Sequence, residues 1–298
     1  MLNLEISESV QQLGATGKGA EGFTQLVMHE IKSDYENYLG TLLLPKDAQR
    51  AAFALRAFNV ELAQVQDMVS DKRIGLMRMQ FWKDAVAKIV QGSPPEAPVA
   101  TELAGACSYY KLSRRWLERI VAARAAQLDN DYFKSMAVME EYAEHVNSSL
   151  YYLLLECLGI KNVQADHAAS HLGKAQGIVT TIRATPFHAA KRRVYLPMDI
   201  LANHRVSHED IIRGSTNQRV KDAVFDVASV AHQHLEKARS LKGSLPPKSN
   251  LVFLNATFCL VFDIAGDLNE KKYWSLCACM CDVKTSSKFC CVTSYVSM

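Results

Sequence analysis

The sequence has 298 residues, of which 49% are hydrophobic, and a formal net charge of +3. Together with a mean hydropathy of -0.06, these values indicate an ordinary soluble chain that is long enough to bury a sizeable core. With 14 glycines and 8 prolines, it is neither collagen-like nor extensively disordered. The small charge surplus gives no reason to expect a nucleic acid as partner. No window approaches the roughly 20 apolar residues that a membrane-spanning helix needs.

The two ends of the chain differ from its body. Residues 1–20 are rich in Gly, Ser, Thr and Gln, and we expect a flexible N-terminal segment there. Two glutamates precede the first basic residue, Lys18, whereas a mitochondrial presequence is rich in arginine and poor in acids. Residues 249–298 form a divergent Cys-rich tail, with six of the eight cysteines between residues 259 and 291. Because no secretory signal peptide precedes them, we interpret these cysteines as free thiols in a reducing compartment.

Helical periodicity dominates the body of the chain, residues 21–248. Apolar residues recur there at spacings of three and four, which is the pattern of one helix face. The predicted helices cover residues 47–68, 74–90, 113–128, 136–158, 166–182 and 218–241. The Gly-Ser-Pro-Pro run at 92–95 and Gly159 are typical helix ends. Only residues 193–196 read as extended, and Pro197 ends them, so we expect one all-α domain.

Two stretches of this body carry an informative pattern. They are ALRAFNVELAQVQD at 54–67 with RMQFWKD at 78–84, and HLGKAQ at 171–176 followed by IRATP at 182–186 and RVYLP at 193–197. Together these motifs resemble the squalene/phytoene synthase family of head-to-head prenyl transferases. The likeness spans roughly residues 30–245. It implies an isoprenoid-synthase-type helical bundle with a central cavity between the helices.

The resemblance also indicates where catalytic metals would bind. In the family, two aspartate-rich helical motifs hold Mg²⁺ ions, which neutralise the diphosphate leaving group through hard oxygen ligands. The corresponding positions of this chain, which we regard as vestigial, are Ala63, Gln64 and Asp67 in the first motif and Ala184, Phe187 and His188 in the second. One aspartate cannot hold a cluster of metal ions. We therefore expect no catalytic residue, no metal and no other cofactor; the alternative is an active prenyl diphosphate transferase with a rebuilt metal site.

A basic rim lies beside the second motif. It consists of Lys191, Arg192 and Arg193, with Arg183 one helix end earlier. In active family members, basic residues here help to hold the diphosphate, so the resemblance makes these four residues candidates for binding an anionic ligand or a lipid headgroup. An ordinary solvated loop is the simpler interpretation, and the sequence does not decide between the two.

Further stretches resemble a mitochondrial branch of the family that assists the assembly of respiratory complex I (NADH:ubiquinone oxidoreductase). They are IGLMRMQFWK, ADHAASH, GKAQGIVT and LPMDI. This resemblance implies a non-enzymatic assembly factor at the matrix side of the mitochondrial inner membrane. Its partners would be complex I subunits or other assembly factors, with an inner-membrane lipid or a prenyl molecule as a candidate ligand. A cytoplasmic location is the alternative, because residues 1–20 do not resemble a presequence and the tail differs from that of the branch.

Two other patterns suggest metal ions, but simpler interpretations fit both of them better. His167 and His171 have a zinc-ligand spacing on a helix, yet no third ligand is near in the sequence. Helix capping by Asp166 and partly buried histidines explain that segment more simply. The C-x-C-x-C run at 277–281 differs from the C-x₂₋₄-C spacing of structural zinc sites.

Overall fold

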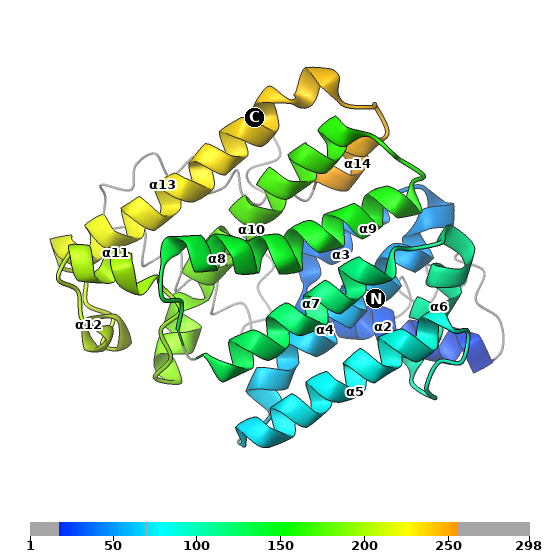
Figure 1. Ribbon diagram of the computed structural model, residues 1–298, viewed down its shortest axis with the longest axis horizontal. Coiled ribbons are helices and arrows are strands. Elements are labelled where there is room, and N and C mark those ends of the chain that lie inside the picture. The colour runs from blue at the N-terminus through cyan, green and yellow to red at the C-terminus, as the bar shows by residue number, and fades with distance from the viewer. Residues whose placement is uncertain (1–17, 70, 131, 255–298) are drawn as a thin grey trace, which may run out of the picture.

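The computed structural model of the protein describes residues 18–69, 71–130 and 132–254, and within these ranges it contains helices and no strand (Figure 1). The predicted all-α fold is therefore confirmed. Most of the N-terminal segment and all of the 277–281 run lie outside the described residues. In the described part, no helix combines the length and the apolar character that crossing a membrane requires.

The helices are α2 (Lys18–Ser33), α3 (Tyr35–Leu42), α4 (Lys46–Met68), α5 (Lys72–Val90), α6 (Pro98–Tyr110), α7 (Arg114–Asp129), α8 (Met136–Ala143), the π-helix η1 (Glu144–Ser148), α9 (Ser149–Cys157), α10 (Val163–Ala190), α11 (Met198–Asn203), α12 (His208–Ile212), α13 (Gln218–Ser240), the 3₁₀ turn η2 (Lys242–Ser244) and α14 (Ser249–Phe253).

The six helices that periodicity predicts are all present. The helix predicted at 136–158 is an uninterrupted succession of α8, η1 and α9. Gly92 and Gly159 adopt positive φ angles of 80° and 67° just after their helices, as expected for glycines that end helices. Residues 193–196 are non-helical and connect α10 to α11, which agrees with the prediction. The periodicity analysis did not mark helices α2, α3, α6, α11, α12 and α14.

The helices enclose two clusters of buried apolar side chains. The larger cluster lies among α2 to α7, α9 and the first half of α10, and includes Phe53, Phe58 and Leu153. The smaller one lies among α8, the second half of α10 and α11 to α13, and includes Ile178 and Val220. Because α10 contributes to both clusters, it connects the two halves of the bundle.

Close contact between α10 and the π-helix η1 depends on two glycines, Gly173 and Gly177. They are four residues apart and so lie on one face of α10. A Cβ atom on Gly173 would lie 2.4 Å from the backbone nitrogen of Ser148. A Cβ atom on Gly177 would lie 2.6 Å from the side-chain nitrogen of Asn147 in η1, and 2.5 Å from the Cβ atom of Ala143 at the end of α8. Any larger residue at either position would push the two helices apart.

Helix α10 extends beyond the predicted end at Ile182. It continues through Pro186 to Ala190, although proline removes a backbone donor and usually ends a helix. Buried Ile182 and Ala189 anchor the helix on both sides of the proline, so packing outweighs the lost hydrogen bond. The longer helix brings the second motif and the basic rim to one end of the bundle.

A helical turn also lies beyond residue 248, in the segment that the sequence assigns to the tail. There α14 packs against α9 and α10. Its Val252 is 2% exposed and belongs to the larger cluster. The residues after 254 lie outside the described part of the chain.

Candidate functional site

The two stretches that we predict to be vestigial motifs lie on α4 and on the end of α10, and side-chain contacts join them. Asp67 is the acidic member of the first motif. Its Oδ1 atom is 2.5 Å from Lys191 Nζ and 3.8 Å from Arg193 Nη1. Arg193 Nη1 also lies 3.5 Å from the backbone carbonyl oxygen of Gln66, and Lys191 Nζ lies 4.1 Å from the centre of the Phe187 ring. The Asp67 carboxylate is thus neutralised by two cations from the basic rim.

Gln64 of the first motif and Gln66, which lies between the motif positions, form hydrogen bonds to neighbouring elements. Gln64 Oε1 lies 3.0 Å from His29 Nε2, and its amide nitrogen donates to Ser33 Oγ at 2.9 Å. Gln66 donates from Nε2 to the hydroxyl oxygen of Tyr195. These bonds connect α4 to α2 and to the segment after α10. The glutamines therefore act as structural cross-links between elements.

His188 of the second motif is a neutral imidazole near neutral pH. Burial lowers its pKa to about 4; Asp67 opposes this shift, while Lys191 and Arg193 add to it. The ring packs edge-on against Tyr195, with 4.7 Å between the ring centres. Among the described residues, its buried Nδ1 atom has no hydrogen-bond partner. The side chain at this predicted motif position thus carries no negative charge.

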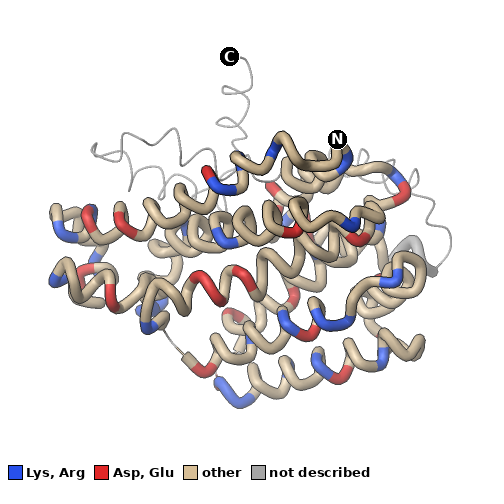
Figure 2. Tube along the Cα trace, turned by 45° about the horizontal axis from the view of Figure 1, so that its top comes forward, with Lys and Arg blue, Asp and Glu red and all other residues tan. Residues whose placement is uncertain are grey.

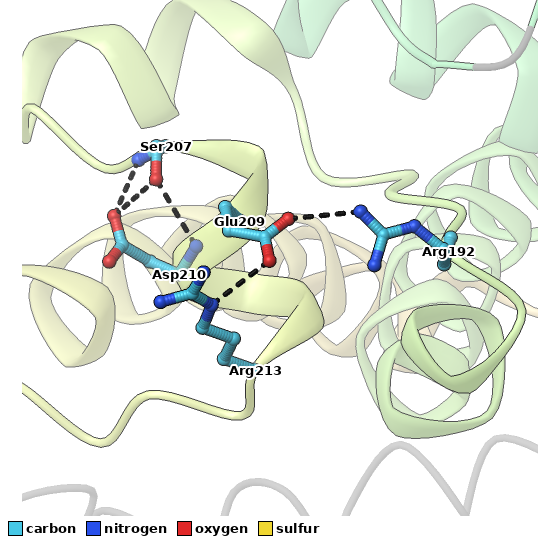
Figure 3. Close-up of polar contacts among 5 residues, drawn as sticks. All are labelled: Arg192, Ser207, Glu209, Asp210 and Arg213. Atoms are coloured by element: carbon cyan, nitrogen blue, oxygen red, sulfur yellow. Dashed lines mark hydrogen bonds and ion pairs between the residues drawn. The ribbon is translucent and has the colours of Figure 1, made fainter.

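The remaining two residues of the basic rim also face carboxylates. Arg183 donates two hydrogen bonds to Glu36 of α3, at 2.9 and 2.7 Å. Arg192, with a φ angle of 57°, lies 3.2 Å from Glu209. Glu209 also accepts a hydrogen bond from Arg213 at 2.9 Å, and that bond is the main cause that lowers the pKa of Glu209 (Figure 3). An anionic ligand at the rim would have to compete with these acids.

Helix α12 presents Glu209 to Arg192 through a capping box. The Ser207 backbone nitrogen and hydroxyl both donate to Asp210 Oδ2, at 2.9 and 2.6 Å (Figure 3). The backbone nitrogen of Asp210 donates back to Ser207 Oγ at 3.2 Å. This reciprocal arrangement fixes the first turn of the helix, which contains Glu209.

The structure brings together two histidines that the sequence does not connect. His171 Nδ1 on α10 lies 2.9 Å from His234 Nδ1 on α13. His234 Nε2 lies 2.6 Å from Glu140 Oε1 on α8. His167, the other histidine of the predicted zinc spacing, is exposed. Across the described ranges, no three His, Cys, Asp or Glu side chains are placed to hold a metal ion.

A buried polar group beside the first motif was not predicted. Glu30 of α2 is completely buried, and within the described structure neither carboxylate oxygen has a hydrogen-bond partner. Arg56 of α4 is 3% exposed, and its Nε and Nη2 atoms have no hydrogen-bond partner there either. Burial raises the pKa of Glu30 well above its usual value; Asp34 adds to this and Arg56 opposes it. The sequence signal is present, because Glu30 continues the apolar face of Phe23 at helical spacing.

A pocket among the described residues lies away from both motifs. It has a volume of about 590 Å³ and is lined by residues 158–162 and 246–248. These residues form the connection between α9 and α10 and the segment before α14. This pocket is different from the central cavity that the family resemblance implies between the helices. That cavity stays a prediction.

Comparisons with known proteins identify the family. The sequence model of squalene/phytoene synthase matches residues 31–279. The chain belongs to this family. It is 53% identical over 240 residues to "NADH dehydrogenase (ubiquinone) complex I, assembly factor 6" of Bos taurus. The matched region covers 80% of this chain and 72% of that protein. The protein of the same name in Homo sapiens is 52% identical over 241 residues, with the same two coverages.

The solved structures support the fold. A squalene synthase, HpnC from Alicyclobacillus acidocaldarius, superposes with a TM-score of 0.72 over 86% of this chain and 97% of its own. The two sequences are 15% identical, so this likeness shows the isoprenoid-synthase fold alone. The predicted fold and the predicted family, including its complex I assembly factor branch, are therefore confirmed.

The family's magnesium ions do not fit the residues at the positions that we predict for the two motifs. Mg²⁺ needs several hard oxygen ligands in near-octahedral geometry. Of the six positions, Asp67 alone carries a carboxylate, and that carboxylate already faces Lys191 and Arg193. The other positions offer methyl groups, an amide, a phenyl ring and an imidazole.

Proposed function

We propose that this chain is a non-enzymatic assembly factor for mitochondrial complex I, built on a prenyl-synthase fold that has lost its Mg²⁺-binding aspartates. Relatives named complex I assembly factor 6 are 52–53% identical to it over most of its length. The likeness to prenyl synthases of known structure is limited to the fold. Since a fold does not imply an activity, the residues at the motif positions carry more weight.

The observation that best supports this proposal is the pairing of Asp67 with Lys191 and Arg193. A prenyl transferase uses cationic side chains to hold the diphosphate and carboxylates to hold the metal ions. Here the cations and the acid face one another directly. Converting this arrangement into a working site would require breaking both ion pairs and supplying further carboxylates. An active prenyl transferase with a rebuilt metal site is therefore the less favoured function.

The proposal includes a location and partners. We place the protein at the matrix side of the mitochondrial inner membrane, in contact with complex I subunits or other assembly factors. The basic rim of Arg183, Lys191, Arg192 and Arg193 is the candidate contact for a lipid headgroup. Its internal ion pairs are partly exposed, and a headgroup phosphate would have to replace the carboxylates in them.

The proposal is tested in cells that lack the Homo sapiens relative. The full chain is expressed with a matrix-targeting leader, and complex I is measured by native gel electrophoresis and by NADH:ubiquinone activity. We expect the chain to restore both, as the Homo sapiens protein does in parallel, with complex II unchanged. If the chain accumulates in the matrix as a folded protein but complex I stays at the level of the deletion cells, the proposal is wrong.

A further inference from the structure

Helix α5 presents an apolar stripe on the outside of the bundle. Its inner face packs against α4, α6 and α7 through buried Met79 and Trp82, and Figure 1 shows the helix along one edge of the molecule. On its outer face, Ile74, Met77 and Phe81 are 49%, 72% and 48% exposed. Their spacings of three and four residues place them on one side of the helix. Apolar residues that gather on one exposed side of a helix, rather than being scattered singly, are a feature of surfaces that bind another molecule.

Charged residues continue the same stripe. Asp84 and Lys88 follow Phe81 after three and seven residues, so positions 74, 77, 81, 84 and 88 alternate steps of three and four. This is the seam along which two helices pack in a coiled coil. Asp84 accepts a hydrogen bond from Gln80 at 2.9 Å, and Lys88 is exposed in the last turn of α5. The stripe on the outer face is thus apolar at its start and charged at its end. Figure 2 shows that α5 as a whole has Lys and Arg near both of its ends.

We propose that this face of α5 is the docking site for an amphipathic helix of a partner protein. The partner helix would place apolar residues against Ile74, Met77 and Phe81, a basic residue near Asp84 and an acidic residue near Lys88. Exposed Arg73 and Arg78 flank the stripe and favour further acidic residues at the edges of the partner helix. This inference rests on the proposed function, because an assembly factor acts by binding other proteins.

A second copy of the chain fits this seam poorly. An antiparallel pair of α5 helices centred on Phe81 would bring Ile74 against Lys88 and Met77 against Asp84. A parallel pair would bring Asp84 against Asp84 and Lys88 against Lys88. Burying an unpaired charge against an apolar side chain, or two like charges together, is unfavourable. The stripe therefore favours a different chain with complementary charges.

An anionic lipid surface also fits less well than a protein helix. Helices that lie in a membrane interface have a long continuous apolar face with basic residues around it. The apolar part of this stripe covers only about two turns, from Ile74 to Phe81. Asp84 then places a carboxylate on the surface that would face the anionic headgroups. A protein helix can supply a basic residue at that point, whereas a lipid surface cannot.

The docking site is tested by photo-crosslinking in the full chain. A photoreactive phenylalanine analogue replaces Met77, and in a matched control it replaces Phe225 of α13, which is 52% exposed. Both variants are expressed in mitochondria of the deletion cells, and the crosslinked peptides are sequenced. We expect position 77 to be crosslinked to a peptide from a complex I subunit or from an assembly factor. The apolar residues of this peptide should recur at spacings of three and four, with a basic residue placed to meet Asp84 and an acidic residue placed to meet Lys88. Products containing only lipid, a second copy, residues 255–298 of the same chain, or the peptide also obtained from position 225 would overturn the proposal.

Substitutions then separate this proposal from the proposed function. Met77→Glu should reduce the amount of the crosslinked partner that co-purifies with the chain by about tenfold. The level of complex I should fall with it. Phe225→Glu should leave both unchanged. Glu and Met have similar helix propensities and Met77 is mostly exposed, so an unchanged melting temperature is the folding control. If the wild-type chain restores complex I and Met77→Glu restores it equally, the α5 site is wrong while the assembly role stands.

Discussion

His188 gives the site a pH dependence whose sign follows from its burial. Its pKa is about 4 in the folded chain, against an ordinary value of 6.5. Between these values the unfolded chain binds a proton that the folded chain does not, so the free energy of unfolding falls as the pH drops from 6.5 towards 4. We predict that His188→Phe, which keeps an aromatic ring against Tyr195, reduces the stability difference between pH 7 and pH 5 by about 1–2 kcal/mol. Urea unfolding at both pH values measures this, and an unchanged difference would show that His188 titrates normally.

Asp67 should have a modest structural role. Its side chain is 34% exposed, and ion pairs at such positions typically contribute about 1 kcal/mol or less. We predict that Asp67→Asn lowers the free energy of unfolding by about that amount and that the effect shrinks at high salt. A double-mutant cycle with Lys191→Met isolates the pair. A rise in melting temperature with MgCl₂, beyond that of NaCl at equal ionic strength and lost in Asp67→Asn, would instead indicate a metal ligand.

At the scale of elements, the contact of α10 with η1 is the most sensitive to a single methyl group. Gly173→Ala would bring a Cβ atom to 2.4 Å from the Ser148 backbone, and backbone cannot move aside cheaply. We expect a loss of about 3 kcal/mol of stability. Gly105→Ala in α6 is the matched control, because nothing lies within 4 Å of its Cβ position; it should stabilise the chain by up to about 1 kcal/mol. Thermal unfolding of both variants checks this, and equal effects would contradict the close approach described for η1.

The elements also show what the sequence could predict. Local periodicity placed α4, α5, α7 and α13 within a few residues of their observed ends, because each buries one apolar stripe. It did not place the end of α10, since tertiary packing of Ile182 and Ala189 outweighs the signal of Pro186. The identities at the motif positions could be read from the sequence by resemblance, but their partners could not. Arg183 meets Glu36 across 147 positions, and no local pattern encodes such a pair.

For the whole molecule, the helical fold of a squalene synthase is retained, and under the proposed function its charged groups serve a different purpose. Acid–base pairs join α10 and the segment after it to α3, α4 and α12. Under the proposed function, these pairs lie where an active relative would bind diphosphate and metal ions. The surface that we propose for a partner is the outside of the bundle, where α5 exposes its apolar stripe. The fold thus fits the role of a scaffold for binding.

The most direct test of this view is the release of inorganic diphosphate. The purified full chain is incubated with Mg²⁺ and either farnesyl or geranylgeranyl diphosphate, beside an active squalene synthase as positive control. We predict release no higher than in the blank without protein, for the wild type and for Asp67→Asn alike. Release above the blank that requires Mg²⁺ and disappears in Asp67→Asn would contradict the loss of catalysis and identify the chain as a working prenyl transferase.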